Sequence, residues 1–271
     1  MSVAQAQRRN PEMVALLSAD FQNRYEPNFA WKSVCGLYAS LPCLRGFWPM
    51  SGEGYAGQAL DQCGLGHLLT RIDAPHYGYE NLIPYVEMDG TNDALTYADD
   101  ANYDITGTET YTVAAQLGLT LGCWVKPDTF PGVGTTDGII CKSAGAGHRS
   151  YQIRFNSTQV AAIEVSVDGT ATKIVNSTET ATASVWHLII GRFIPQTSQT
   201  IFYDNIETES VAGVPASIFN SDAPLMVGCT GSGVGANFFD GKMSMAFICA
   251  CALSNSIITA IWQQTRAMYG R

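Results

Sequence analysis

The sequence predicts an all-β protein: an antiparallel two-sheet jelly-roll sandwich with an N-terminal helical arm and a short C-terminal helix. From residue 44 onward, about a dozen short apolar runs alternate with turns rich in Gly, Asn and Asp. Helical spacing of apolar residues appears only near the two ends of the chain. Strands in series with helices confined to the ends are typical of a sandwich.

Residues 1–43 are predicted to form the arm, and residues 44–271 the sandwich domain. Asn10 can cap a helix with Pro11 at its first position, and Met13, Leu17 and Phe21 then share one side of that helix. A second short helix is expected over 31–40. The apolar side of the arm needs a partner, which is either the outer face of the domain itself or a neighbouring subunit.

Strands follow in order along the domain. We expect them at 44–50, 85–88, 94–97, 119–125, 138–142, 151–156, 160–167, 173–176, 186–192, 200–203 and 225–228. The segment 73–84 is predicted to be a loop rich in aromatics, and the segment after 203 a loop as well. Ser254 or Asn255 caps a last helix that runs through Met268.

The closing strand, within 239–253, carries no charge between Met243 and Leu253. Strand alternation puts Ser244, Ala246, Ile248 and Ala250 on one face. The other face receives Met243, Met245, Phe247, Cys249 and Cys251. Neither face shows the polar alternation of a strand with one wet side, so we expect both faces to be covered.

Composition excludes some classes of partner. The 271 residues include 46% apolar and only 14% charged residues, with a formal net charge of −9 and no run of Lys or Arg. Such a chain is not expected to bind nucleic acid. No run approaches the length of a membrane span and no secretion signal is evident, so no membrane partner is expected. The eight cysteines are interpreted as buried free thiols, with disulfides or metal binding as alternatives.

Six motifs in order resemble the laminin-G-like branch of the concanavalin A-like jelly rolls. They are GFWPM with DQCGLGHLLT, YVEMDGTNDALTYAD, LTLGCWVKPD, the strand beginning at Trp186-His187, Tyr203-Asp204-Asn205, and FFDGKMSMAFICACALS. The resemblance covers roughly 44–268, although the Gly of the family's Tyr-x-Asn-Gly hairpin is missing. It implies the fold, which hosts lectins, glycosidases, adhesion modules and virion proteins.

The closing strand departs from that family, whose outward positions usually carry charge. The resemblance assigns Ala246, Ile248 and Ala250 inward, so Met245, Phe247, Cys249 and Cys251 form an apolar outer patch. We expect this patch to be an interface, together with Met13, Leu17 and Phe21 of the arm. Low charge and a helical arm are also similar in style to laminin-G-like proteins of tailed-phage virions.

No catalytic residues are predicted. A glycosidase needs two carboxylates about 5–9.5 Å apart. Glu164 and Asp168 are separated by a turn, and Glu207 and Glu209 fall in the expected loop. No nucleophile elbow of the Gly-x-Ser-x-Gly type is present.

Two ligand sites are candidates. Asp89, Asp93 and Asp99 belong to an Asp-rich stretch that could hold Ca²⁺, the one cofactor considered, although the same residues also close turns. Tyr77, Tyr79 and Asn81 could contact a glycan from a rim loop, and packing against the rim is the alternative.

The main functional hypothesis is a non-enzymatic structural protein of a bacteriophage virion, located in the capsid decoration or the tail. Its partners would be further copies of itself, as a homo-oligomer, and other virion proteins such as the major capsid protein. The alternative is a carbohydrate-binding adhesion module that recognises surface glycans. A glycan-cleaving enzyme using Glu164 is the third hypothesis.

Overall fold

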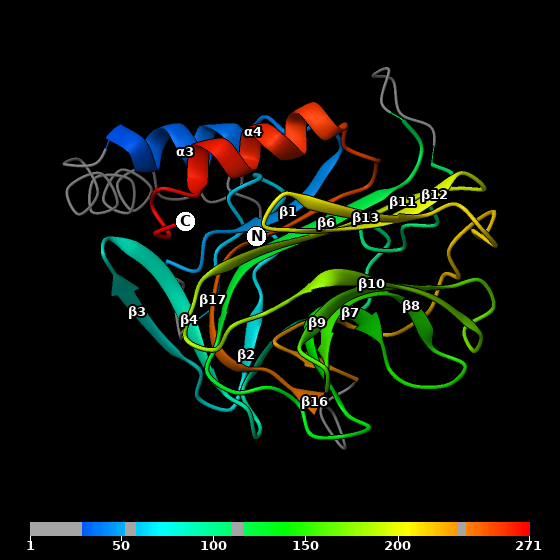
Figure 1. The fold of residues 1–271 in the computed structure, drawn as a ribbon, viewed down its shortest axis with the longest axis horizontal. Helices are drawn as coiled ribbons and strands as arrows, with labels where there is room; N and C mark the ends of the chain where they lie inside the picture. The colour runs from blue at the N-terminus through cyan, green and yellow to red at the C-terminus, as the bar shows by residue number, and fades with distance from the viewer. Residues whose placement is uncertain (1–28, 52–57, 110–115, 232–236) are drawn as a thin grey trace, which may run out of the picture.

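The computed structural model describes residues 29–51, 58–109, 116–231 and 237–271 of the chain. These residues form an eight-stranded and a seven-stranded sheet. Figure 1 shows the layers: the helices lie on one sheet, and the other sheet is farthest from them. The antiparallel two-sheet fold predicted from the sequence is confirmed. Met13, Leu17 and Phe21, which the sequence predicted to share one side of a helix, lie outside the described residues.

The eight-stranded sheet has β17 near its centre. Its strands run in the order β13 (Ile206–Ser210), β12 (Ser198–Tyr203), β11 (His187–Ile194), β6 (Leu119–Pro127), β17 (Asp240–Cys249), β4 (Ile83–Asp89) and β3 (His76–Glu80). Strand β6 pairs along one side of β17. On the other side, the first residues of β17 pair with β4 and the later ones with β1 (Leu44–Trp48).

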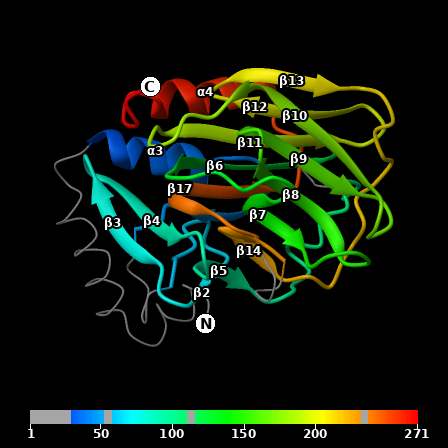
Figure 2. The ribbon, with the colours of Figure 1, turned by 60° about the horizontal axis from the view of Figure 1, so that its bottom comes forward.

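The seven-stranded sheet, whose strands run from β10 at the upper right of Figure 2 to β2 at its lower centre, is built around the hairpins of the middle of the chain. Its order is β10 (Thr172–Thr180), β9 (Val160–Ser166), β8 (Arg149–Asn156), β7 (Thr136–Ser143), β14 (Leu225–Val227), β5 (Ala94–Tyr97) and β2 (Thr70–Ile72). A small ribbon joins β15 (Cys229–Thr230) to β16 (Asn237–Phe238).

Two strands occur where the sequence predicted loops. Strand β3 lies in the aromatic segment 73–84, and β13 lies in the segment after 203 that was expected to hold Glu207 and Glu209 in a loop. Both are at the edges of the eight-stranded sheet, where a strand needs only one hydrogen-bonded neighbour. Their sequences, His-Tyr-Gly-Tyr-Glu and Ile-Glu-Thr-Glu-Ser, are too polar to show the apolar pattern of a central strand.

Apolar side chains from both sheets meet in the principal core. In β8, Tyr151, Ile153 and Phe155 face inward, and Ile163 of the neighbouring β9 joins them. All four are at most 1% exposed. This alternation leaves the residues between them on the outer face of the seven-stranded sheet.

A second core lies between the eight-stranded sheet and the helices α3 (Phe29–Ala39) and α4 (Asn255–Thr265). Ser254 caps α4 as the sequence predicted, because its side chain accepts a hydrogen bond from the backbone N–H of Ile257. Trp124 of β6 stacks on Tyr269, just beyond α4, with ring centroids 4.0 Å apart. Its indole Nε1 donates to Thr265 Oγ1 at 3.1 Å.

The outer patch of β17 belongs to this second core. Met245, Phe247, Cys249 and Cys251 are completely buried, and they pack in the same cluster as residues of α3 and α4. Phe247 lies over Gly122 of β6, where an added Cβ would come within 2.6 Å of the Phe247 ring. The patch is covered, and its cover comes from the same chain: α3, which lies within the predicted arm, and the C-terminal α4.

A bulge in β17 changes which residues face each way. Met245 has a φ of +50°, and the pairing with β6 shifts between Ser244 and Phe247. Met243 therefore points into the principal core, although strict alternation placed it outward. Ser244 points toward the helices instead, where its hydroxyl donates to Pro84 O at 2.7 Å and accepts from Tyr269 Oη at 2.8 Å.

Each of the eight cysteines, all within the described ranges, is a free thiol. Five of them are buried, which agrees with the interpretation as small apolar residues. Burial raises the pKa of Cys35 to about 12. Neither helix in the described part of the chain is long and apolar enough to cross a membrane.

Replacing Phe247 tests the second core. Phe247→Ala should lower the free energy of unfolding by about 3–5 kcal/mol, because it leaves a cavity beneath the helices. The measurement is denaturant unfolding of the dilute protein. Val211→Ala, at a side chain that is 69% exposed, should change the value by less than about 0.5 kcal/mol. If Phe247→Ala lowered the free energy of unfolding by as little as Val211→Ala, the described packing of Phe247 beneath the helices would be contradicted.

Candidate functional site

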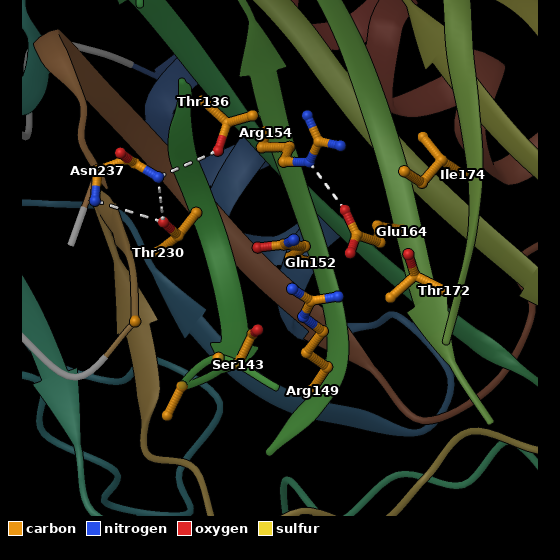
Figure 3. Close-up of a pocket in the computed structure, with 13 residues that line it drawn as sticks. Thr136, Ser143, Arg149, Gln152, Arg154, Glu164, Thr172, Ile174, Thr230 and Asn237 are labelled. Atoms are coloured by element: carbon orange, nitrogen blue, oxygen red, sulfur yellow. Dashed lines mark hydrogen bonds and ion pairs between the residues drawn. The ribbon is translucent and has the colours of Figure 1, made fainter. Parts of the chain in front are cut away.

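A polar groove of about 560 Å³ lies on the outer face of the seven-stranded sheet. Figure 3 shows its side chains rising from the middle of the sheet and from the small ribbon beside it. The labelled lining residues are Thr136, Ser143, Arg149, Gln152, Arg154, Glu164, Thr172, Ile174, Thr230 and Asn237.

An ion pair forms part of the groove floor. Arg154 of β8 donates from Nε to Glu164 Oε2 of β9 at 3.0 Å. Both residues are at least nine-tenths buried, at 8% and 7% exposure. A desolvated pair of this kind resists rearrangement, because separating the charges would leave each of them without a partner. The pair therefore gives the floor a fixed shape.

Gln152 lies beside this pair, opposite Glu164 in the register of β8 and β9. It is 8% exposed, and its Oε1 has no hydrogen-bond partner among the described residues. A buried acceptor without a donor costs about 1–3 kcal/mol. A donor brought by a ligand or by water would recover that cost.

Hydroxyl and amide groups occupy the rim. The side-chain amide of Asn237 donates to Thr230 Oγ1 at 3.3 Å and to Thr136 Oγ1 at 3.4 Å. Each threonine hydroxyl accepts in these contacts, so its own hydrogen remains available to a ligand. Arg149 donates from Nη1 to the carbonyl oxygen of Thr170 at 3.0 Å.

The groove carries two guanidinium groups and one carboxylate among its described lining residues. Its local charge is thus positive, in a chain whose formal net charge is −9. A positive groove on an acidic protein favours ligands that bring hydrogen-bond acceptors or negative charge.

The described lining of the groove does not contain the carboxylate pair of a glycosidase. Glu164 is the one carboxylate among the described lining residues, and it forms an ion pair with Arg154. Asp168 lies in the exposed turn after β9 and accepts hydrogen bonds from the backbone N–H groups of Thr170 and Ala171. The Glu207 carboxylate belongs to the other sheet, where it pairs with Arg192.

The predicted glycan residues lie away from the groove, on or beside the edge strand β3. Tyr77 packs against the principal core, whereas Tyr79 is 47% exposed and donates to Ser51 O at 3.1 Å. Asn81, in the turn after β3, lines a separate recess with Trp186. Of the three residues, only Asn81 lines this recess, so the structure does not bring them together as one site.

The predicted metal ligands are occupied by other contacts. Asp89 Oδ1 accepts three backbone N–H groups from residues 91–93, and Asp93 accepts from the N–H of Ala74. Asp99 pairs with the buried Lys142. Within the described ranges, no three His, Cys, Asp or Glu side chains are grouped so that they could hold a metal ion.

The groove was not predicted from the sequence, although a signal for it exists. Between the inward residues Tyr151, Ile153 and Phe155, the polar Gln152 and Arg154 must face outward. Two long polar side chains on the outer face of a central strand indicate a polar surface. Their pairing with Glu164 depended on the strand register, which the sequence did not fix.

A family model described as the concanavalin A-like lectin/glucanases superfamily matches residues 89–259. Curated protein sequences gave no match. The matched segment includes β7, β8 and β9, and therefore most of the groove.

Solved structures share the fold at low sequence identity. The binding domain of Paraclostridial Mosquitocidal Protein 1 matches with a TM-score of 0.63 and 9% identity, over 83% of this chain and 52% of that chain. The Botulinum Neurotoxin serotype G binding domain matches at 0.60 and 10%, over 82% and 51%. The binding domain of Botulinum Neurotoxin DC in complex with SialylT matches at 0.59 and 8%, over 82% and 51%. The chain thus spans about half the length of these structures.

The Arg154–Glu164 pair can be tested by removing one charge. Glu164→Gln should lower the free energy of unfolding by about 3 kcal/mol, because it leaves a buried guanidinium without its carboxylate. The double variant Arg154→Met with Glu164→Leu should recover most of that loss. Both values come from denaturant unfolding.

Glu179→Gln provides the matched control, because Glu179 is an exposed residue of β10. Its free energy of unfolding should stay within about 0.5 kcal/mol of the unsubstituted protein. An equally small effect of Glu164→Gln would show that the pair is solvated and that the groove floor is not fixed by it.

Proposed function

Because the chain belongs to the concanavalin A-like lectin/glucanase superfamily and carries an open polar groove, we propose that it is a non-catalytic carbohydrate-binding module. The observation that carries the proposal is the buried polar set of Gln152, Arg154 and Glu164 at the floor of that groove. The ligand surface is therefore the outer face of the seven-stranded sheet, and not the edge strand β3 that holds Tyr79.

The groove offers the chemistry that sugar hydroxyls require. A hydroxyl both donates and accepts, and the groove presents guanidinium donors, a carboxylate acceptor, and amide and hydroxyl groups that do both. Ile174, which is 40% exposed, provides an apolar surface for the C–H face of a ring. No aromatic side chain lines the groove in the described part of the chain, so recognition depends on hydrogen bonds more than on stacking.

A binding role agrees with two further observations. The solved structures that share the fold are named as binding domains, one of them in complex with SialylT. The groove's described residues supply one carboxylate, whereas glycoside hydrolysis usually needs a pair. These observations support binding without cleavage.

The virion hypothesis rested on an apolar outer strand that needed a partner. In the structure α3 and α4 lie over that strand, and Phe247 is fully buried beneath them. The strand therefore gives no reason to invoke a homo-oligomer or a capsid protein, and the carbohydrate-binding function is the better supported proposal.

Gln152→Leu tests the groove as the ligand site. Oligosaccharide arrays with neutral and acidic members would identify a ligand, and calorimetry would measure its affinity. The substitution keeps the side-chain volume similar and removes the polar amide. We expect the affinity to fall by about tenfold or more, since one hydrogen bond to a buried group is worth about 1.4 kcal/mol.

Tyr79→Ala is the matched control, because Tyr79 lies on the other sheet and serves the rim-loop alternative. Its affinity should not change. If Tyr79→Ala lost binding and Gln152→Leu bound fully, the ligand site would lie at the rim near Tyr79 and not in the groove. Release of reducing ends from the bound oligosaccharide would overturn the non-catalytic proposal.

A further inference from the structure

A second recess, of about 450 Å³, opens at one end of the sandwich. Its walls are the turn after β4, the loop between β6 and β7, the strand β16 and the start of β17. Asn237 lines both this recess and the polar groove, so the two are neighbours. The recess otherwise uses different side chains.

Asp137 is the buried acid of this recess. Strand alternation in β7 directs Thr136 outward to the groove and Asp137 inward, opposite Phe155 in the register. Asp137 is only 8% exposed, and its carboxylate makes no hydrogen bond or ion pair with any described residue. Burial, with a smaller contribution from Asp240, raises the pKa of Asp137 to about 7.

The other charges at the recess are also negative. Asp240 accepts a hydrogen bond from the Thr129 hydroxyl, and Asp89 accepts backbone N–H groups of its own turn. No Lys, Arg or His side chain lines the recess in the described part of the chain. Asp137 therefore faces acidic groups, and none of the described residues supplies a cation to neutralise it.

Aromatic rings complete the walls. The half-buried Phe130 and Phe238 line the recess together with Pro131. An aromatic face attracts a cation, and a carboxylate without a partner favours one strongly. The aromatic rings and the carboxylate of Asp137 therefore both favour a positively charged ligand.

We propose that this recess binds an organic ammonium group, with Asp137 as its counter-ion and Phe130 and Phe238 as its walls. The volume suits a molecular head group and far exceeds a bare ion. The carboxylates do not form a group that could hold a metal ion in the described structure. The inference does not depend on the carbohydrate-binding proposal, because it uses other side chains.

Amide-detected NMR titrations of the full chain at about pH 8.5 would test the site, since Asp137 is then mostly ionised. The probes are butylammonium chloride, an amine on an alkyl stem, and ethanolamine hydrochloride, an amine beside a hydroxyl group, both of which stay protonated at this pH. Butanol, ethanol and sodium chloride are the neutral and ionic controls. We expect at least one amine to give saturable shifts confined to the recess, and the controls to give none.

Asp137→Asn should weaken that binding by about tenfold or more, because it removes the counter-ion and keeps the shape. The variant should fold, since it relieves a buried charge. Asp168→Asn, at an exposed turn, is the matched control for loss of one carboxylate and should bind as before. Gln152→Leu should also bind as before, which separates this site from the groove.

The pH dependence provides a second readout. Binding should weaken as the pH falls through about 7, because protonation of Asp137 removes its charge. The other acids at the recess are Asp240, which accepts a hydrogen bond from the Thr129 hydroxyl, and Asp89, which accepts backbone N–H groups of its own turn. Equal affinity in Asp137→Asn, absence of saturable shifts with both amines, or recess binding of calcium chloride in place of the amines would overturn the proposal.

Discussion

Trp124 lies where the eight-stranded sheet meets the helices, and the arrangement of the three layers depends on its burial. Its ring stacks on Tyr269 and, at a centroid distance of 5.6 Å, on Trp262 of α4. Burying a large apolar side chain stabilises a fold by about 1.5–3 kcal/mol, and stacked aromatic pairs add to this. Phe247 and the rest of the second core extend the same contact along β17 toward α3, where Tyr38 stacks on Phe47.

This cover makes the two sheets unequal. The central strands β6, β11 and β17 of the eight-stranded sheet are buried over almost their whole length, which explains why β17 can be apolar from Met245 onward. No described helix lies over the outer face of the seven-stranded sheet (Figure 1). Polar side chains that would be costly beneath α4 are therefore tolerated there, and Gln152, Arg154 and Glu164 gather into a groove. The location of the candidate binding site follows from which sheet the helices cover.

The sequence predicted most central strands because their apolar runs are long and bounded by turn residues; β5, for example, spans the expected 94–97. It failed at β3 and β13, edge strands whose polar residues hide the strand pattern. It placed Met243 on the wrong face because a bulge at Met245 breaks the period of two. The groove could not be predicted, because the pairing register of β8 and β9 brings Arg154 and Glu164 together and the sequence pattern does not specify that register. Likewise, an apolar outer face shows that a cover is needed, but not whether the cover comes from the same chain.

The central claim is that the chain covers its own outer strand, and thiol labelling tests it most directly. Cys249 is fully buried beneath the helices, whereas Cys63 is partly exposed. Burial raises the pKa of Cys249 well above its usual value and that of Cys63 to about 12, so the two thiols differ in their access to the reagent more than in their ionisation. Mass spectrometry of the labelled peptides across a dilution series should show Cys63 labelled and Cys249 protected to the same extent at every protein concentration. Labelling of Cys249 that increases on dilution would mean that a second subunit covers the strand, and would contradict the account.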